Sequence, residues 1–163
     1  MAEPKYHPCL HVVLFQPEIP HNTGSVGRTC VAIGAKLWLV RPLGFRLDDY
    51  YLRRAGLDYW EHLHVEVVDD WESLDRKLIA ASGRPPWLFA KSAEQTYVSA
   101  NFEKGDILVF GRESDGLPSW LHERYADRRL RIPLRPEVRS LNLSNAVAVV
   151  AYEAIRQGVG QPS

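Results

Sequence analysis

The sequence predicts an α/β fold in which helices flank a mostly parallel sheet. Short apolar runs rich in β-branched residues alternate with segments that carry helix caps and stops, and no internal period recurs. The chain has 163 residues, which is enough for one proper hydrophobic core. We therefore expect a single domain over residues 1–163.

The first part of the chain has the pattern of a strand–helix–strand unit. The segment 11–15 is apolar and β-branched, as in a buried strand. Asn22 or Thr23 offers a side-chain oxygen that can cap the following helix, and Gly34 can end it. The apolar segment 36–40 then forms the second strand. This order is typical of a parallel sheet.

The same alternation continues to the end of the chain. Further strands are expected at the apolar runs 64–68, 87–90, 107–110 and 130–132. Helices are expected from Asp48 to Gly56, from Asp70 to about Ala81 and after Pro118, with one helical turn inside 91–104. The last helix, 144–157, is capped by Asn142 or Ser144 and stops at Gly158. Its many small and β-branched residues predict burial by more than one neighbour.

Overall charge favours no polyanionic partner, because 20 Lys and Arg balance 20 Asp and Glu. The arginines nevertheless gather in two runs, 41–54 and 124–139. Local basic patches of this kind are what a nucleic acid needs, since phosphate contacts dominate its affinity. A mixed, solvated surface is the alternative explanation for both runs.

The sequence indicates neither secretion nor a metal centre. The N-terminus lacks an apolar signal core, and the longest apolar run, 146–152, is too short to span a bilayer. We therefore expect a soluble, cytoplasmic protein with no membrane partner. Cys9 and Cys30 form no redox motif and are expected to be reduced. His7, Cys9 and His11 alternate without a fourth ligand, so no metal is expected.

Polar loops follow three of the predicted strands, at 16–23, 111–118 and 133–144. Ligands of open α/β sheets bind at the carboxyl ends of the strands, so these loops could converge into one site. The first loop combines a helix N-terminus with Arg28, which favours a phosphate. The second is expected to carry Glu113 as a free carboxylate, and it lacks both the dinucleotide fingerprint and the P-loop lysine. A capped helix with a surface arginine and a plain turn would explain the same residues.

The chain resembles the SPOUT superfamily of RNA ribose 2′-O-methyltransferases in three segments, LFQPEIPHNTGSVGR, LVFGRESDGLP and RIPLRPEVRSLNLSNAVAVVAYEA. A further stretch is similar to the single-domain branch that methylates the wobble nucleotide, position 34, of tRNA: PLGFRLDDYYLRRAGLDYW. The resemblance implies a C-terminal trefoil knot, S-adenosylmethionine as the methyl donor, a homodimer that completes the site, and the tRNA anticodon stem-loop as partner.

The resemblance also implies roles for individual residues. Cofactor binding falls to Lys91, Gly111, Ile132 and Ser140, although Lys91 departs from the apolar residue expected there. Catalysis and substrate positioning fall to Arg28, Asn22, Glu113, Ser144 and Asn145. Because no appended RNA-binding domain is evident, we expect arginines of the basic runs to hold the RNA, namely Arg41, Arg46, Arg53, Arg54 and Arg139.

The expected reaction is attack of the ribose 2′-hydroxyl of C34 or a modified U34, in leucine isoacceptors, on the sulfonium methyl group. Arg28 is a poor base because a guanidinium keeps its proton. We expect it to grip the adjacent phosphate and orient the hydroxyl, while the phosphate or Glu113 accepts the proton. The small side chains of the helix 144–157 make that helix the expected dimer surface.

Other functions stay open on the sequence alone. They are a SPOUT enzyme acting on another RNA position, an RNA-binding module without catalysis, and an α/β enzyme unrelated to nucleic acids. The fold cannot decide among them. The sequence also leaves open which tRNA isoacceptors are modified, the choice between C34 and U34, any need for an earlier modification, and the proton acceptor.

Overall fold

A computed structural model describes residues 7–48, 54 and 59–160. Its centre is a six-stranded sheet in the order β3-β2-β1-β5-β4-β6, and all neighbouring strands run parallel. The strands are β1 Leu10–Phe15, β2 Lys36–Val40, β3 Val65–Val68, β4 Trp87–Phe89, β5 Asp106–Phe110 and β6 Arg129–Leu130. The predicted α/β class with a parallel sheet is confirmed.

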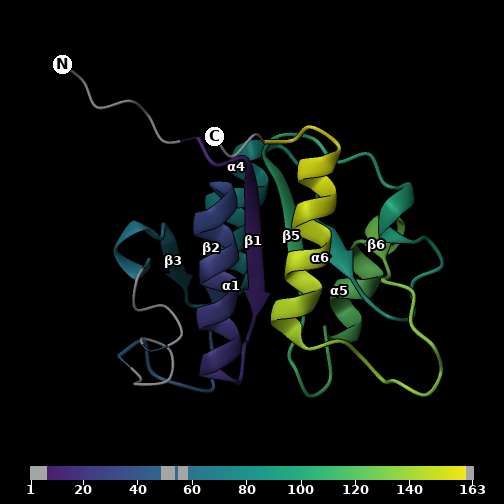
Figure 1. Cartoon of the computed structure of the whole chain (residues 1–163), viewed down its shortest axis with the longest axis horizontal. Coiled ribbons are helices and arrows are strands. Elements are labelled where there is room, and N and C mark those ends of the chain that lie inside the picture. The colour runs from purple at the N-terminus through teal and green to yellow at the C-terminus, as the bar shows by residue number, and fades with distance from the viewer. Residues whose placement is uncertain (1–6, 49–53, 55–58, 161–163) are drawn as a thin grey trace.

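Helices cover both faces of the sheet (Figure 1). The helices α1 (Pro20–Ile33) and α6 (Leu143–Arg156) lie side by side on one face. The other face is covered by α3 (Trp71–Leu74), η2 (Asp75–Ile79), α4 (Ala80–Ser82) and α5 (Ser119–Arg124). Shorter turns are η1 Trp60–His62, η3 Tyr97–Ser99 and η4 Ala126–Arg128.

Both faces of the strand β1 are buried, which explains why its sequence is apolar at consecutive positions. Val12 and Leu14 belong to the apolar cluster under α1 and α6, whereas Val13 and Phe15 belong to the cluster under α3 and α5. All four are at most 5% exposed. A parallel strand covered on both faces needs apolar residues on both, so the run 11–15 reads as continuous rather than alternating.

The helix α1 begins earlier than the sequence predicts. Asn22 and Thr23, the two expected caps, lie inside the helix and are buried. The helix starts at Pro20, which suits a first position because its missing N–H would have no partner there. Ile19 at the N-cap offers no side-chain oxygen, and no side chain caps the first turn of the helix. The predicted end is confirmed, with Gly34 in the left-handed region at φ 78°.

The helix α6 begins with one of its two predicted caps. The side chain of Asn142 accepts hydrogen bonds from the backbone N–H groups of Ser144 and Asn145, at 2.9 and 3.4 Å. Burial is less complete than predicted, because Val149 and Tyr152 stay 37% and 49% exposed. An apolar stripe of α6 therefore faces outward.

Other predicted elements differ in detail. Asp70 caps α3 as expected, accepting from Ser73 N at 2.8 Å, but the helix that follows is interrupted by the π-helical turn η2. The sixth strand ends at Leu130 and is shorter than predicted. The helix predicted from Asp48 to Gly56 falls largely outside the described residues. Both cysteines are free, as expected, and both are buried.

In the described part of the chain, no helix is long and apolar enough to cross a membrane. No group of three or more His, Cys, Asp or Glu side chains gathers there into a possible metal site.

Candidate active site

The predicted loops meet at the edge of the sheet where the strands end, toward which the β1 arrow points in Figure 1. The first loop follows β1, the second follows β5 and the third follows β6. The backbone of the first loop donates to Glu113 of the second, and the Asn142 side chain of the third donates to Asn22 Oδ1 at 3.0 Å. Segments about a hundred residues apart in sequence thus form one polar cluster.

Two carboxylates join the first loop to the second in a reciprocal arrangement that we call the Glu18–Glu113 clasp. Glu113 accepts hydrogen bonds from Glu18 N at 2.8 Å and Ile19 N at 3.2 Å. Glu18 in turn accepts from the backbone N and the hydroxyl of Ser114, at 2.9 and 2.7 Å. The Ser114 hydrogen bonds hold the pKa of Glu18 below its usual range, so its carboxylate stays charged at neutral pH.

The expectation that Glu113 is a free carboxylate is wrong. Its two oxygens accept from the backbone N–H groups of Glu18 and Ile19, the two residues just before α1. The helix dipole favours a negative charge at this position. The anion expected at this helix end is therefore the protein's own Glu113, and a substrate phosphate must be bound by other groups.

Gly111 is required by the shape of the second loop. A Cβ at this position would lie 2.3 Å from Gly116 C and 2.5 Å from Leu117 N, which are backbone atoms that cannot move aside. Arg112 and Gly116 exchange backbone hydrogen bonds of 3.2 and 3.0 Å across the turn. This closed turn holds Glu113 and Ser114 at its tip, facing the first loop.

Asn142 links α1 to the first turn of α6. It caps α6 through its oxygen and reaches the buried Asn22 through its nitrogen. Ser144 and Asn145 follow directly on the capped turn. Asn22, Ser144 and Asn145, which the sequence predicts as site residues, are thus brought together around a residue that the sequence predicts only as a cap.

Arg28 lies apart from this cluster within one chain. It is exposed on α1, eight residues after Pro20, or roughly 12 Å along the helix axis. Its guanidinium lies over the ring of Tyr59, with Cζ 5.4 Å from the ring centroid. It forms no ion pair with any residue in the described ranges. Its charge is thus available to a ligand.

The residues expected to hold the cofactor come mostly from adjacent strand ends. β4 pairs with both β5 and β6, so Lys91, Gly111 and Ile132 leave the sheet side by side. Backbone bonds from Ala90 N to Leu130 O (2.9 Å) and from Tyr97 N to Arg131 O (3.0 Å) align the outer loops. Lys91 is exposed and Ile132 half-buried, whereas Ser140 lies on the exposed approach to α6. An apolar side chain, a glycine turn and backbone polar groups together fit a nucleoside-type cofactor.

The described arginines among those expected to bind RNA lie at the surface. Arg41 pairs with Asp69 at 3.2 Å and Arg46 with Asp48 at 3.1 Å, and both arginines are exposed. Exposed pairs of this kind contribute about 0–1 kcal/mol, so a phosphate can replace the carboxylate at little cost. Arg54 and Arg139 are also exposed, and Arg53 lies outside the described residues.

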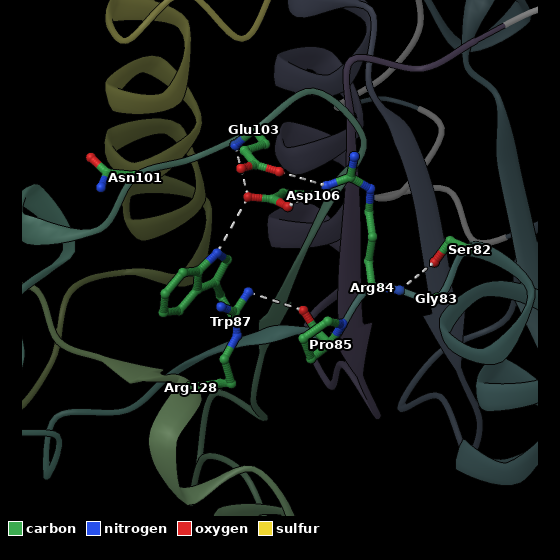
Figure 2. A pocket seen from close by; sticks show the side chains of 9 residues that line it. All are labelled: Ser82, Gly83, Arg84, Pro85, Trp87, Asn101, Glu103, Asp106 and Arg128. Atoms are coloured by element: carbon green, nitrogen blue, oxygen red, sulfur yellow. Dashed lines mark hydrogen bonds and ion pairs between the residues drawn. The ribbon is translucent and has the colours of Figure 1, made fainter.

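A pocket of about 450 Å³ lies at the opposite, amino-terminal edge of the sheet (Figure 2). Its polar groups bind one another: Asp106 accepts from Arg84 at 3.2 Å and from Trp87 Nε1 at 3.3 Å, and Arg128 lies 3.4 Å above the Trp87 ring. Asp106 is only 5% exposed. We interpret this cluster as a structural cross-link between the starts of β4 and β5.

Sequence reasoning missed two residues that organise the site. Glu18 belongs to the conspicuous segment QPEIP, but nothing local shows that its carboxylate meets Ser114. Tyr59 lies in the stretch that resembles the wobble-methylating branch, but nothing local connects it with Gly24 and Arg28, which are 35 and 31 residues away. Both depend on how distant segments pack.

Comparison with known proteins identifies the family. The pattern of the SpoU rRNA Methylase family matches residues 9–152, a range that holds all the described site residues. The chain belongs to this family. The resemblance seen in the three motifs is thereby confirmed, and the matched range contains all three converged loops.

Relatives within the family extend over nearly the whole chain. A tRNA (cytidine(34)-2'-O)-methyltransferase of Burkholderia pseudomallei (strain 1106a) is 48% identical over 151 residues, covering 90% of this chain and 94% of the relative. A structure solved to study the 2-OH methylation of C/U34 on tRNA has a TM-score of 0.88 and 46% identity, and the match covers 95% of this chain and 99% of that chain.

A more distant family member was solved with its cofactor. The SpoU methyltransferase AviRb from Streptomyces viridochromogenes in complex with AdoMet has a TM-score of 0.79 and 26% identity, and the match covers 97% of this chain and 61% of that chain.

Proposed function

We propose that this chain transfers a methyl group from S-adenosylmethionine to the ribose 2′-hydroxyl of nucleotide 34 of tRNA. The main support is the convergence of the three motif loops at one edge of the sheet, in a chain of the SpoU family. A relative named for this activity is 48% identical over 90% of the chain. Leucine isoacceptors, expected from the wobble-methylating branch, and a cytoplasmic location, expected from the lack of a signal segment, complete the proposal.

Positioning is the main task of the protein in this reaction. When bound, S-adenosylmethionine supplies a methyl group on a sulfonium centre that is already activated. Gly111, Ile132 and the backbone after β4 would hold it, with Ser140 and Lys91 at the exposed rim. Aligning the hydroxyl for in-line attack can supply much of the rate enhancement.

Arg28 and the substrate phosphate account for the remaining chemistry. Arg28 binds the phosphate next to nucleotide 34 and orients its ribose. The 2′-hydroxyl must lose its proton as the new bond between its oxygen and the methyl carbon forms and the methyl–sulfur bond breaks, with the electron pair staying on sulfur. Because both oxygens of Glu113 already accept backbone N–H groups, we propose the phosphate as the proton acceptor.

A homodimer would complete this site. Arg28 lies about two turns from the clasp in its own chain. The adjacent helix α6 exposes Val149 and Tyr152, an apolar stripe suited to a second copy. Docking along this face would bring Arg28 of one protomer toward the cofactor loops of its partner.

This dimer predicts a sharp effect of one charge on α6. Val149→Glu is expected to shift the protein to monomers and to reduce methylation, because the stripe would bury an unpaired carboxylate. Light scattering and the methyl-transfer rate measure the two effects. Val98→Glu on η3 is the matched control, since Val98 is 55% exposed on a different element and should leave the dimer intact. A dimer that survives Val149→Glu places the interface elsewhere.

We further propose that the C-terminal part of the chain forms the trefoil knot expected from the resemblance. Two contacts support it. Arg131 exchanges backbone bonds with Gln95 and Tyr97, and the Gln157 side chain binds Phe102 N at 2.8 Å and Ala100 O at 3.0 Å. The segment 95–102 is thus held on both sides by the chain that follows β6.

The basic runs would hold the anticodon stem-loop. The double variant Arg54→Ala with Arg139→Ala is expected to weaken tRNA binding and to lower the slope of log K against log salt by about 1 per arginine. Filter binding over a range of salt concentrations measures this slope. Arg76→Ala on η2 is the control. Arg76 is also exposed, but η2 lies on the face of the sheet away from α1 and α6. An unchanged slope would place the RNA on another surface.

The proposed function itself is tested by methyl transfer from labelled cofactor to total tRNA, followed by mapping of the product. Label at the 2′-oxygen of nucleotide 34 is the expected result. Label at another position would favour a different RNA target, and cofactor binding without transfer to any RNA would contradict the proposal.

A further inference from the structure

The segment that carries η1 packs closely on α1 beside Arg28. The hydroxyl of Tyr59 donates to the backbone carbonyl of Gly24 at 3.1 Å. Three residues along, Gly27 gives room for the same segment, since a Cβ there would lie 3.0 Å from Leu63 Cδ2 and 3.7 Å from the Trp60 ring. Both glycines are buried. The missing side chain of Gly27 and the carbonyl of Gly24 therefore form the seat in which residues 59–63 lie.

This seat sets the position of the Tyr59 ring relative to Arg28. The hydrogen bond fixes the hydroxyl end of the ring, and the guanidinium of Arg28 lies over its face at 5.4 Å. The face of an aromatic ring attracts a guanidinium electrostatically, but it has no strong hydrogen-bond acceptor for the N–H groups. Arg28 is thus held in one orientation while its N–H donors stay available to a phosphate.

We infer that Tyr59 is a positioning residue for the reaction, acting through Arg28. The inference rests on the proposed function, because it assigns Tyr59 a role in orienting the arginine that binds the substrate phosphate. A free arginine side chain samples many rotamers, and a misplacement of about 1 Å in an active site can cost about 100-fold in rate. Tyr59 itself is no proton acceptor, since its hydroxyl donates to Gly24.

The experiment compares two variants of Tyr59 in the full chain. Tyr59→Leu removes the aromatic face and is expected to lower kcat for tRNA methylation about 10-fold or more, with unchanged affinity for S-adenosylmethionine by calorimetry. Tyr59→Phe keeps the face and loses only the hydroxyl, so it should retain kcat within about threefold. Tyr59→Gln replaces Tyr59→Leu in the same comparison if the leucine variant unfolds.

A double-mutant cycle separates positioning from a general structural role. In an Arg28→Ala background, Tyr59→Leu should reduce kcat no further, because the residue on which it acts is gone. Additive losses, or full activity of Tyr59→Leu alone, would overturn the inference. Trp120→Leu is the control, since it removes an arginine–aromatic contact of the same 5.4 Å, to Arg124 on α5, and should leave kcat unchanged.

Methylation of tRNA by the unsubstituted protein tests the proposed function independently of the Tyr59 variants. Absence of tRNA methylation by that protein overturns the proposed function and the inference together. Methylation that is indifferent to Tyr59 overturns the inference alone.

Discussion

Arg28→Ala is expected to lower kcat for tRNA methylation about 100-fold or more, while the affinity for S-adenosylmethionine stays the same. Arg28 is exposed, and among the described residues its guanidinium contacts the ring of Tyr59. Removing the guanidinium therefore leaves no buried group unpaired. The loss therefore falls on the substrate phosphate and the orientation of the ribose. Single-turnover methyl transfer measures the rate, and calorimetry measures cofactor binding.

Two further variants sharpen this result. Arg28→Lys keeps the charge but not the planar fork, and should recover only part of the rate. Arg76→Ala, which removes an exposed arginine from η2, should behave like the unsubstituted protein. If Arg28→Ala turns over at a near-normal rate, Arg28 has no part in the mechanism.

Glu113→Ala is expected to be almost as damaging, for a different reason. The substitution leaves the N–H groups of Glu18 and Ile19 without an acceptor at the N-terminus of α1. The free energy of unfolding should fall by about 1–3 kcal/mol, and the loss of loop alignment should lower kcat by roughly 10-fold or more. Thermal unfolding and methyl-transfer kinetics measure the two effects.

Glu113→Gln distinguishes the clasp from acid–base chemistry. A glutamine keeps one oxygen that can accept from these N–H groups, so it should recover part of the stability and of the rate. If Glu113 were the proton acceptor, Glu113→Gln and Glu113→Ala would both remove it. An equal loss of rate in the two variants, with the free energy of unfolding unchanged, would therefore show that Glu113 takes the proton. Glu18→Ala breaks the other half of the clasp and should reproduce the loss of alignment without touching Glu113.

The fold was open to prediction because its signals are local. Each strand is a short apolar run between polar turns, and burial on both faces of a parallel sheet demands such runs. Asn142 and Asp70 cap the helices that they precede, and Gly34 ends α1, since caps and stops act within a few residues. These elements follow from the chemistry of neighbouring residues.

The errors arise where distant segments meet. The sequence misplaces the start of α1, because the residues just before the helix are held by Glu113, from a loop 94 residues further along the chain. For the same reason Glu113 looked free in the sequence. Tyr59 could not be connected with Arg28, because that contact depends on two glycines of α1 that admit the η1 segment.

By itself, the sequence determined the α/β class, the alternation of strands and helices, and the three motifs by which the family is recognised. Only the tertiary structure decided which of the motif side chains already have a partner within the protein. Glu113 accepts a hydrogen bond from the backbone just before α1, and Asn22 accepts one from Asn142. The guanidinium of Arg28 lies over the ring of Tyr59. The physical reason is the separation along the chain over which each interaction acts. Propensity and capping act between neighbours in the chain, whereas a hydrogen bond across 94 residues exists only once the sheet has brought its strand ends together.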